Sequence, residues 1–102
     1  METKDINGRL EIDLPGTLDL PAAAELRDTL LDVLARDTGA ELVLRAQAVE
    51  RISTAAVQVL LAAAAGFAGA ARRLELDGAG DSVAAAFRHL GLAADLDKLS
   101  AS

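Results

Sequence analysis

The first element that the pattern of polar and apolar positions predicts is a half-buried strand. Apolar and charged residues alternate over residues 9–14, and a period of two is typical of a strand with one face on the core. Asn7 and Gly8 stand directly before this stretch, and this pair favours a two-residue turn because both turn positions need a positive φ. We therefore expect a short strand over residues 2–6 that folds back on residues 9–14 as a hairpin.

A helix with one apolar side is predicted next. Asp19 can cap its N-terminus, and Pro21 fits its first turn, because the N–H that proline lacks has no helical partner there. The residues of its apolar stripe are Leu26, Leu30, Val33 and Leu34. Gly39 suits the residue after its end. The short run of residues 41–44 shows little alternation, which predicts a central strand that is covered on both faces.

Helix and strand alternate again in the second half of the chain. A second helix is expected to begin at Ser53 or Thr54 and to run to about residue 68, followed by a strand over residues 72–76. Asp81 or Ser82 can cap a third helix. Its expected apolar stripe and the glycine after its end are Val83, Phe87, Leu90 and Gly91. Residues 94–99 are expected to form a last turn or short helix.

This order of elements predicts an α/β fold. We expect a single domain over residues 1–102, built on a mixed sheet of about four strands that a β-hairpin opens. Three to four helices pack on that sheet, because right-handed crossover connections place helices over it.

Composition and charge exclude several functions. Lys and Arg number 10 against 16 Asp and Glu, a net charge of −6, whereas nucleic acids and anionic membranes attract basic surfaces. No cysteine and one histidine exclude thiolate and multi-histidine metal sites. We expect no export signal, because the first residues contain no basic region followed by an apolar run. The most apolar window, residues 55–71, is alanine-rich and interrupted by Gln58 and two glycines, unlike a spanning helix. We expect a cytoplasmic protein with no membrane insertion, metal or cofactor.

The sequence offers no catalytic machinery. His89 lies in the third predicted helix, and no Gly-x-Ser-x-Gly elbow supplies a nucleophile for it. The glycine-containing turns at residues 14–17 and 77–80 lack both the Gly-Lys-Ser/Thr ending and the dinucleotide-binding spacing of phosphate loops. We therefore expect that the protein is not an enzyme.

The most distinctive segment is the turn at Ser53 and Thr54 with the helix that follows. One hydroxyl is expected to cap this helix, which contributes about 1 kcal/mol. A phosphate here would meet the free N–H groups of the first turn and would add about −1.5 to −2 charges to an apolar surface. Ala55, Gln58 and Ala62 are expected near that surface, with Val59 as a further candidate. The residues expected to pack on the sheet are Val57, Leu60, Leu61 and Ala64. Residue chemistry leaves a cap alone and a partner-binding surface both open.

Four motifs in register over nearly the whole chain are characteristic of one family. Gly16-Thr17-Leu18-Asp19 with Leu26-Arg27-Asp28-Thr29-Leu30 resembles the "G-x-L-D … L-R-x-x-L" opening of STAS domains, the family of the bacterial anti-sigma factor antagonists. The segments that continue the resemblance are Leu42-Val43-Leu44, the turn of residues 49–56, Arg72-Arg73-Leu74-Glu75-Leu76 and residues 87–92.

The resemblance implies a non-catalytic signalling protein. In that family a histidine-kinase-like anti-sigma factor phosphorylates the central Ser or Thr of the turn before the second helix, a position that falls on Thr54, with Ser53 as the second candidate. This chain has Ser53 where the family typically has Asp, Ala56 where it has Gly, and Arg45 where Asp is frequent. The residues implied to bind the partner are Ser53, Thr54, Ala55, Gln58 and Ala62.

Several partners are consistent with the resemblance. The first is a histidine-kinase-like anti-sigma factor or a chemotaxis or stress kinase, and a second copy of the chain is a further candidate. STAS domains also serve as constitutive subunits of ABC-type lipid transporters, where a Thr at this turn supports contact with the ATPase. A third interpretation is a module that holds a nucleotide or lipid near the helix N-terminus. Residue chemistry does not separate these roles.

Overall fold

The predicted hairpin opens the main sheet. The computed structural model of the chain describes residues 1–36 and 39–100. Strands β1 (Thr3–Ile6) and β2 (Arg9–Asp13) pair antiparallel, and Asn7 and Gly8 between them have φ angles of 55° and 84°. The Gly8 N–H donates to Oδ1 of Asp5 at 3.0 Å. The two-residue turn and the antiparallel pair are therefore confirmed.

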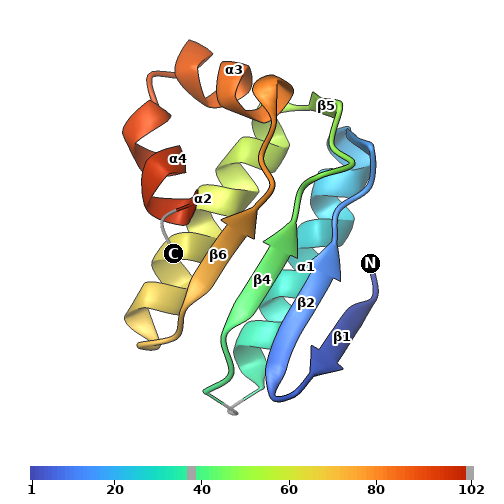
Figure 1. Ribbon diagram of the computed structural model, residues 1–102, viewed down its shortest axis with the longest axis vertical. Coiled ribbons are helices and arrows are strands. Elements are labelled where there is room, and N and C mark those ends of the chain that lie inside the picture. Colours follow the sequence, from blue (N-terminus) through green and yellow to red (C-terminus); the bar gives the residue numbers. More distant parts are fainter. Residues whose placement is uncertain (37–38, 101–102) are drawn as a thin grey trace.

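Two further strands extend this hairpin in parallel. β4 (Leu42–Arg45) pairs with β2, and β6 (Leu74–Asp77) pairs with β4, so the order across the sheet is β1-β2-β4-β6. Figure 1 shows the four strands side by side. The mixed four-stranded sheet opened by a hairpin is confirmed.

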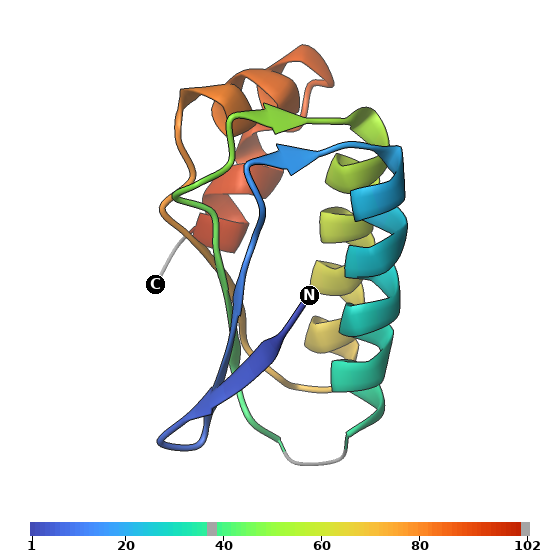
Figure 2. The ribbon, with the colours of Figure 1, turned by 90° about the vertical axis from the view of Figure 1, so that its right-hand side faces the viewer.

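The long helices cover one face of this sheet. α1 (Leu20–Ala35) and α2 (Thr54–Gly69) lie side by side and run in the same direction (Figures 1 and 2). As predicted, Asp19 caps α1, with its Oδ1 accepting the N–H of Ala22 at 3.0 Å. α3 (Asp81–His89) and α4 (Ala93–Ser100) follow β6 in the chain and lie on the side of the molecule where β6 forms the edge of the sheet (Figure 1).

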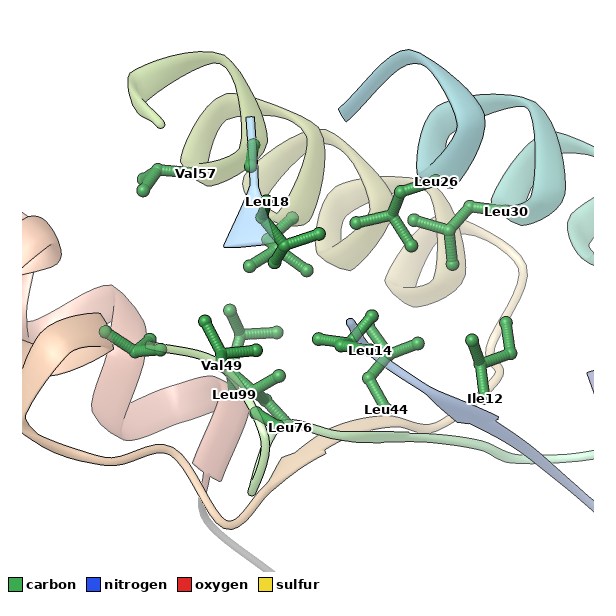
Figure 3. Close-up of a cluster of buried hydrophobic side chains, with 14 of the residues drawn as sticks. Ile12, Leu14, Leu18, Leu26, Leu30, Leu44, Val49, Val57, Leu76 and Leu99 are labelled. Carbon is green, nitrogen blue, oxygen red and sulfur yellow. The ribbon is translucent and has the colours of Figure 1, made fainter. Parts of the chain in front are cut away.

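The core fills the layer between the sheet and these two helices. Ile12 and Leu44 from the strands face Leu26 and Leu30 of α1 (Figure 3), and all four are buried. Phe67 of α2 is also fully buried. Burial of a side chain of this size contributes about 1.5–3 kcal/mol, so the leucine-rich stripes of the strands and helices hold the fold together.

Two short strands were missed by the sequence pattern. β3 (Thr17–Leu18) and β5 (Arg51–Ile52) pair in parallel as a separate two-stranded sheet. Each is only two residues long and immediately precedes a helix, β3 before α1 and β5 before α2. This pair therefore places the N-termini of the two long helices next to each other (Figure 2).

Residues 42–44 lie in the central strand β4 and are all buried, as expected for a strand covered on both faces, although the long helices lie on only one of those faces (Figure 2). Val43 is nevertheless only 4% exposed, beside the buried Glu11, its partner in β2. The Glu11 carboxylate accepts from Arg9 at 2.7 Å and from Arg45 at 3.4 Å. That carboxylate raises the pKa of Arg9. Charged side chains thus cover Val43 in place of a helix.

The start of α3 differs from the prediction. Gly80, rather than Asp81 or Ser82, is the N-cap residue, and Asp81 lies in the first turn, where its charge favours the helix dipole. Gly91 has a φ of 73° after the end of α3, as expected. Leu90 lies just beyond the helix and is 39% exposed, so it does not belong to the buried stripe of Val83 and Phe87.

Candidate functional site

Backbone hydrogen bonds fix the turn that leads into α2. The carbonyl of Gly16 accepts the N–H of Glu50 at 2.7 Å and that of Arg51 at 3.1 Å, and the Ser53 N–H donates to the Leu18 carbonyl at 2.8 Å. A Cβ at position 16 would lie 3.3 Å from the Ala48 carbonyl oxygen, so a glycine suits this close approach. The turn is held rigidly against the segment that starts α1.

Ser53 is the cap of α2. Its φ and ψ of −82° and 159° are extended, and its Oγ accepts the N–H of Ala56 at 3.1 Å. The Ser53 carbonyl also accepts the first helical hydrogen bond, from Val57 at 3.1 Å. This is the arrangement of a serine N-cap. Of the two hydroxyl residues predicted as possible caps, Ser53 is therefore the cap and Thr54 is not.

Thr54 is the first residue of α2, and it is exposed. Within residues 1–36 and 39–100, its hydroxyl takes part in no hydrogen bond. The first turn of α2 carries no acidic residue, so nothing in that turn offsets the positive end of the helix dipole. A negatively charged group on Thr54 would therefore meet a favourable local field.

The outer side of α2 is free of charge. Gln58 and Ala62 are exposed and Ala55 is half-buried, which places all three near the surface with Thr54. On the opposite side Val57 and Leu60 are buried as expected, whereas Leu61 and Ala64 are only half-buried. No Asp, Glu, Lys or Arg occurs between Thr54 and Gly69. A partner would meet small apolar side chains and one amide.

An apolar groove adjoins this surface, between α1 and α2. It has a volume of ≈ 260 Å³, and its lining includes the buried Phe67, the exposed Leu31 of α1, and Val59 and Ala62 of α2. Of the described residues that line it, Arg27 and Gln58 are polar and the others are apolar. The groove was not predicted from the sequence. The one feature that could have indicated it is Leu31, an apolar residue of α1 that lies outside the predicted apolar stripe.

The described part of the chain gives no sign of a metal site or of a membrane span. In residues 1–36 and 39–100 no group of three or more His, Cys, Asp or Glu is arranged to hold a metal ion. Among the same residues, no helix has the length and apolar character needed to cross a bilayer. Ser53, the N-cap of α2, lies next to Thr54, and Thr54 shares α2 with Ala55, Gln58 and Ala62, so the predicted site residues form one uncharged group.

The fold defines a class of small α/β domain, and comparison with known proteins identifies its family. The sequence model described as "Mlab, STAS domain" matches residues 3–99. The chain therefore belongs to this STAS domain family, whose members are non-enzymatic regulatory domains. No curated protein sequence matches the chain.

The fold also resembles a solved STAS structure. It is similar to the Bacillus cell fate determinant SpoIIAA in its phosphorylated form, an anti-sigma factor antagonist, with a TM-score of 0.73 and 16% sequence identity. The match covers 89% of this chain and 83% of SpoIIAA. At this identity the likeness shows the fold, and it confirms the fold class predicted from the sequence.

Proposed function

We propose that this chain is a cytoplasmic, non-catalytic signalling protein of bacteria that binds a regulatory protein through Ser53, Thr54, Ala55, Gln58 and Ala62. Phosphorylation of Thr54 switches this binding. The partner is a histidine-kinase-like protein, either an anti-sigma factor or a chemotaxis or stress kinase. The STAS family and the SpoIIAA-like fold support this role.

The division of labour between the two hydroxyls carries the proposal. Ser53 is committed to the cap by its 3.1 Å hydrogen bond with Ala56, whereas Thr54 is exposed. A kinase can reach the Thr54 hydroxyl without opening the helix, and its modification leaves the cap intact. The favourable end of the helix dipole accommodates the new phosphate.

The same phosphate opposes binding of an apolar partner surface. It adds about −1.5 to −2 charges at pH 7, next to Ala55 and within the uncharged face of α2. Desolvating such a charge without a counter-charge costs several kcal/mol. Phosphorylation is therefore expected to release the partner while the fold stays unchanged.

One feature favours a second candidate, a constitutive subunit of an ABC-type lipid transporter. Ser53 stands where the resemblance to anti-sigma factor antagonists calls for Asp, so the acidic neighbour of the phosphorylated residue is missing. The exposed Thr54 and the apolar face of α2 serve equally well for permanent contact with an ATPase. In that case the surface is used without modification.

Three variants at one position separate these roles. Thr54→Ala keeps the surface uncharged, Thr54→Glu adds a carboxylate, and Thr54→Gln is its uncharged control of the same size. We expect Thr54→Ala and Thr54→Gln to retain partner affinity and Thr54→Glu to lower it at least about tenfold, as one buried unpaired charge requires. Binding is measured by titration with the histidine-kinase-like protein or the transporter ATPase encoded nearest to this gene.

Intact-mass spectrometry after incubation with that kinase-like protein and ATP tests the modification itself. Addition of one phosphate to wild type, and none to Thr54→Ala, supports the switch. Binding to an ATPase with no phosphate transfer supports the transporter role instead. Equal affinity of the wild type and Thr54→Glu would overturn the proposal that this turn lies in the interface.

A further inference from the structure

The groove between α1 and α2 lies beside a protruding leucine on the same face. Leu31 is 58% exposed and forms part of the groove wall. The buried Leu30 and Phe67 and the small residues Ala62 and Ala63 complete that wall. A volume of ≈ 260 Å³ accommodates an additional side chain of leucine size. A knob and a hole that accepts it thus occur together on one surface.

The two polar groups of the groove are placed one helical turn from this knob and hole. Arg27 precedes Leu31 by four residues in α1, and Gln58 precedes Ala62 by four residues in α2. Since residues four apart lie above one another on a helix, and since α1 and α2 run in the same direction (Figure 1), both polar groups lie on the N-terminal side of the apolar contact.

We propose that a second copy of this chain covers the groove, as a two-fold dimer whose axis runs along the helices. In such a dimer α1 of each copy packs on α2 of the other, and residues related by the axis make each contact twice. Leu31 enters the other copy's groove beside Ala62. One turn away, the Arg27 guanidinium meets the other copy's Gln58 and donates to its amide oxygen.

The contact brings no acidic side chains of the groove together, in spite of the net charge of −6 on each copy. Among the residues that the structure describes, no Asp or Glu lines the groove. The acidic residues of α1 at positions 25 and 32 pair elsewhere, Glu25 with the N-terminal amine and Asp32 with Arg36 at 2.8 Å. Arg27 has only an exposed pair with Asp28 at 3.3 Å, and such pairs contribute little. Arg27 can therefore exchange that partner for Gln58.

The size of the face sets the expected strength. Two helices of 16 residues are each about 24 Å long and about 10 Å wide, so side by side they present a face of roughly 500 Å². A standard interface buries about 800 Å² per partner. We therefore expect a weak dimer that forms at micromolar to millimolar concentration. This dimer does not rest on the function proposed above, because it forms without the partner protein.

Sedimentation equilibrium of the purified chain tests the dimer, over concentrations from about 1 μM to 1 mM. We expect dimerisation in the wild type and at least a tenfold weaker association for Leu31→Glu, which inserts a carboxylate into the apolar contact. Leu90→Glu is the matched control, since Leu90 is another exposed leucine outside the groove. A wild type that stays monomeric, or a dimer that Leu31→Glu leaves intact, overturns the proposal.

Disulfide trapping tests the geometry without relying on that variant, because the chain contains no cysteine. Leu31→Cys and Ala62→Cys chains are mixed and oxidised. The proposed packing joins the two different chains in preference to identical ones, because a disulfide needs Cα atoms within about 7 Å. Cross-linking of Leu31→Cys chains mainly to each other would place α1 on α1 and overturn the packing. Failure of both experiments leaves the Thr54 proposal unaffected.

Discussion

Ser53 and Thr54 are adjacent at the N-terminus of α2 but have different roles. The Ser53 Oγ accepts the Ala56 N–H at 3.1 Å, while the Thr54 side chain is exposed. The first hydroxyl is used within the fold. The second is left for the surface. Stability and the proposed partner recognition can therefore be tested separately at these two positions.

Substitution of the two hydroxyl residues is expected to have unequal effects on stability. Ser53→Ala removes the cap and should lower the free energy of unfolding by about 1 kcal/mol. Thr54→Ala should change it by less than about 0.5 kcal/mol, as is usual for surface positions. Urea denaturation followed by circular dichroism measures both. Equal losses for the two variants would contradict the assignment of the cap to Ser53.

A charge at Ala62 is expected to test the outer face of α2 without disturbing the fold. Ala62 is exposed, and glutamate is a good helix former, so Ala62→Glu should unfold at nearly the wild-type urea concentration. Its carboxylate lies in the uncharged face, and partner affinity should fall about tenfold or more. Ala94→Glu, at an exposed position of α4, is the control. Unchanged affinity of a folded Ala62→Glu protein would remove this face from the interface.

Local signals predicted most of the fold. Asn7-Gly8 specifies its own turn, and Asp19 caps α1 through the N–H of a residue only three positions away. These features depend on a few consecutive residues and can be recognised without knowledge of the rest of the chain. The start of α2 at Ser53 and Thr54 was predicted in the same way.

Features that depend on distant residues were missed. β3 and β5 are two residues each, too short for a periodic pattern, and they exist because segments more than 30 residues apart pair with one another. The pattern also did not show that Glu11, the partner of Val43 in β2, is buried in ion pairs with Arg9 and Arg45. The groove likewise depends on how α1 and α2 pack. None of these can be read from local periodicity.

Arg72 is the clearest example of such a distant interaction. It is buried, and its Nη1 donates to the carbonyls of Val33 at 3.0 Å and Arg36 at 3.1 Å at the end of α1. Its Nε donates to the Ala40 carbonyl at 3.1 Å, and its guanidinium carbon lies 4.9 Å from the centre of the Phe67 ring. One side chain thus joins the end of α1, the segment before β4 and α2.

Loss of Arg72 is therefore expected to destabilise the fold strongly. Arg72→Met keeps an apolar stem but leaves buried carbonyls without their donor and removes the cation–π contact. We expect a loss of about 2–4 kcal/mol in the free energy of unfolding. Arg73→Met is the control: Arg73 is exposed and lies 3.8 Å from Glu41, so its loss should cost less than about 1 kcal/mol. Similar urea midpoints for the two variants would contradict this role of Arg72.

The dimer and the partner-bound state are expected to exclude each other, because both use Gln58 and Ala62. By mass action, a species that occupies the free surface lowers the apparent affinity of its competitor. Partner affinity should therefore fall as the concentration of the chain rises through the range in which it dimerises. The test is a titration of a labelled partner at fixed concentration with increasing amounts of the chain. The resulting apparent affinity is compared with the dimer dissociation constant, which is measured independently.

Leu31→Glu distinguishes competition from an unrelated effect of concentration. Leu31 is in the groove but is not one of the five proposed partner-binding residues, so this variant should bind the partner as a monomer at every concentration. Its binding curve should fit a single site, whereas the wild type should show a curve broadened by the competing dimer. A wild-type curve that fits a single site throughout the dimerisation range would mean that the two contacts use separate surfaces.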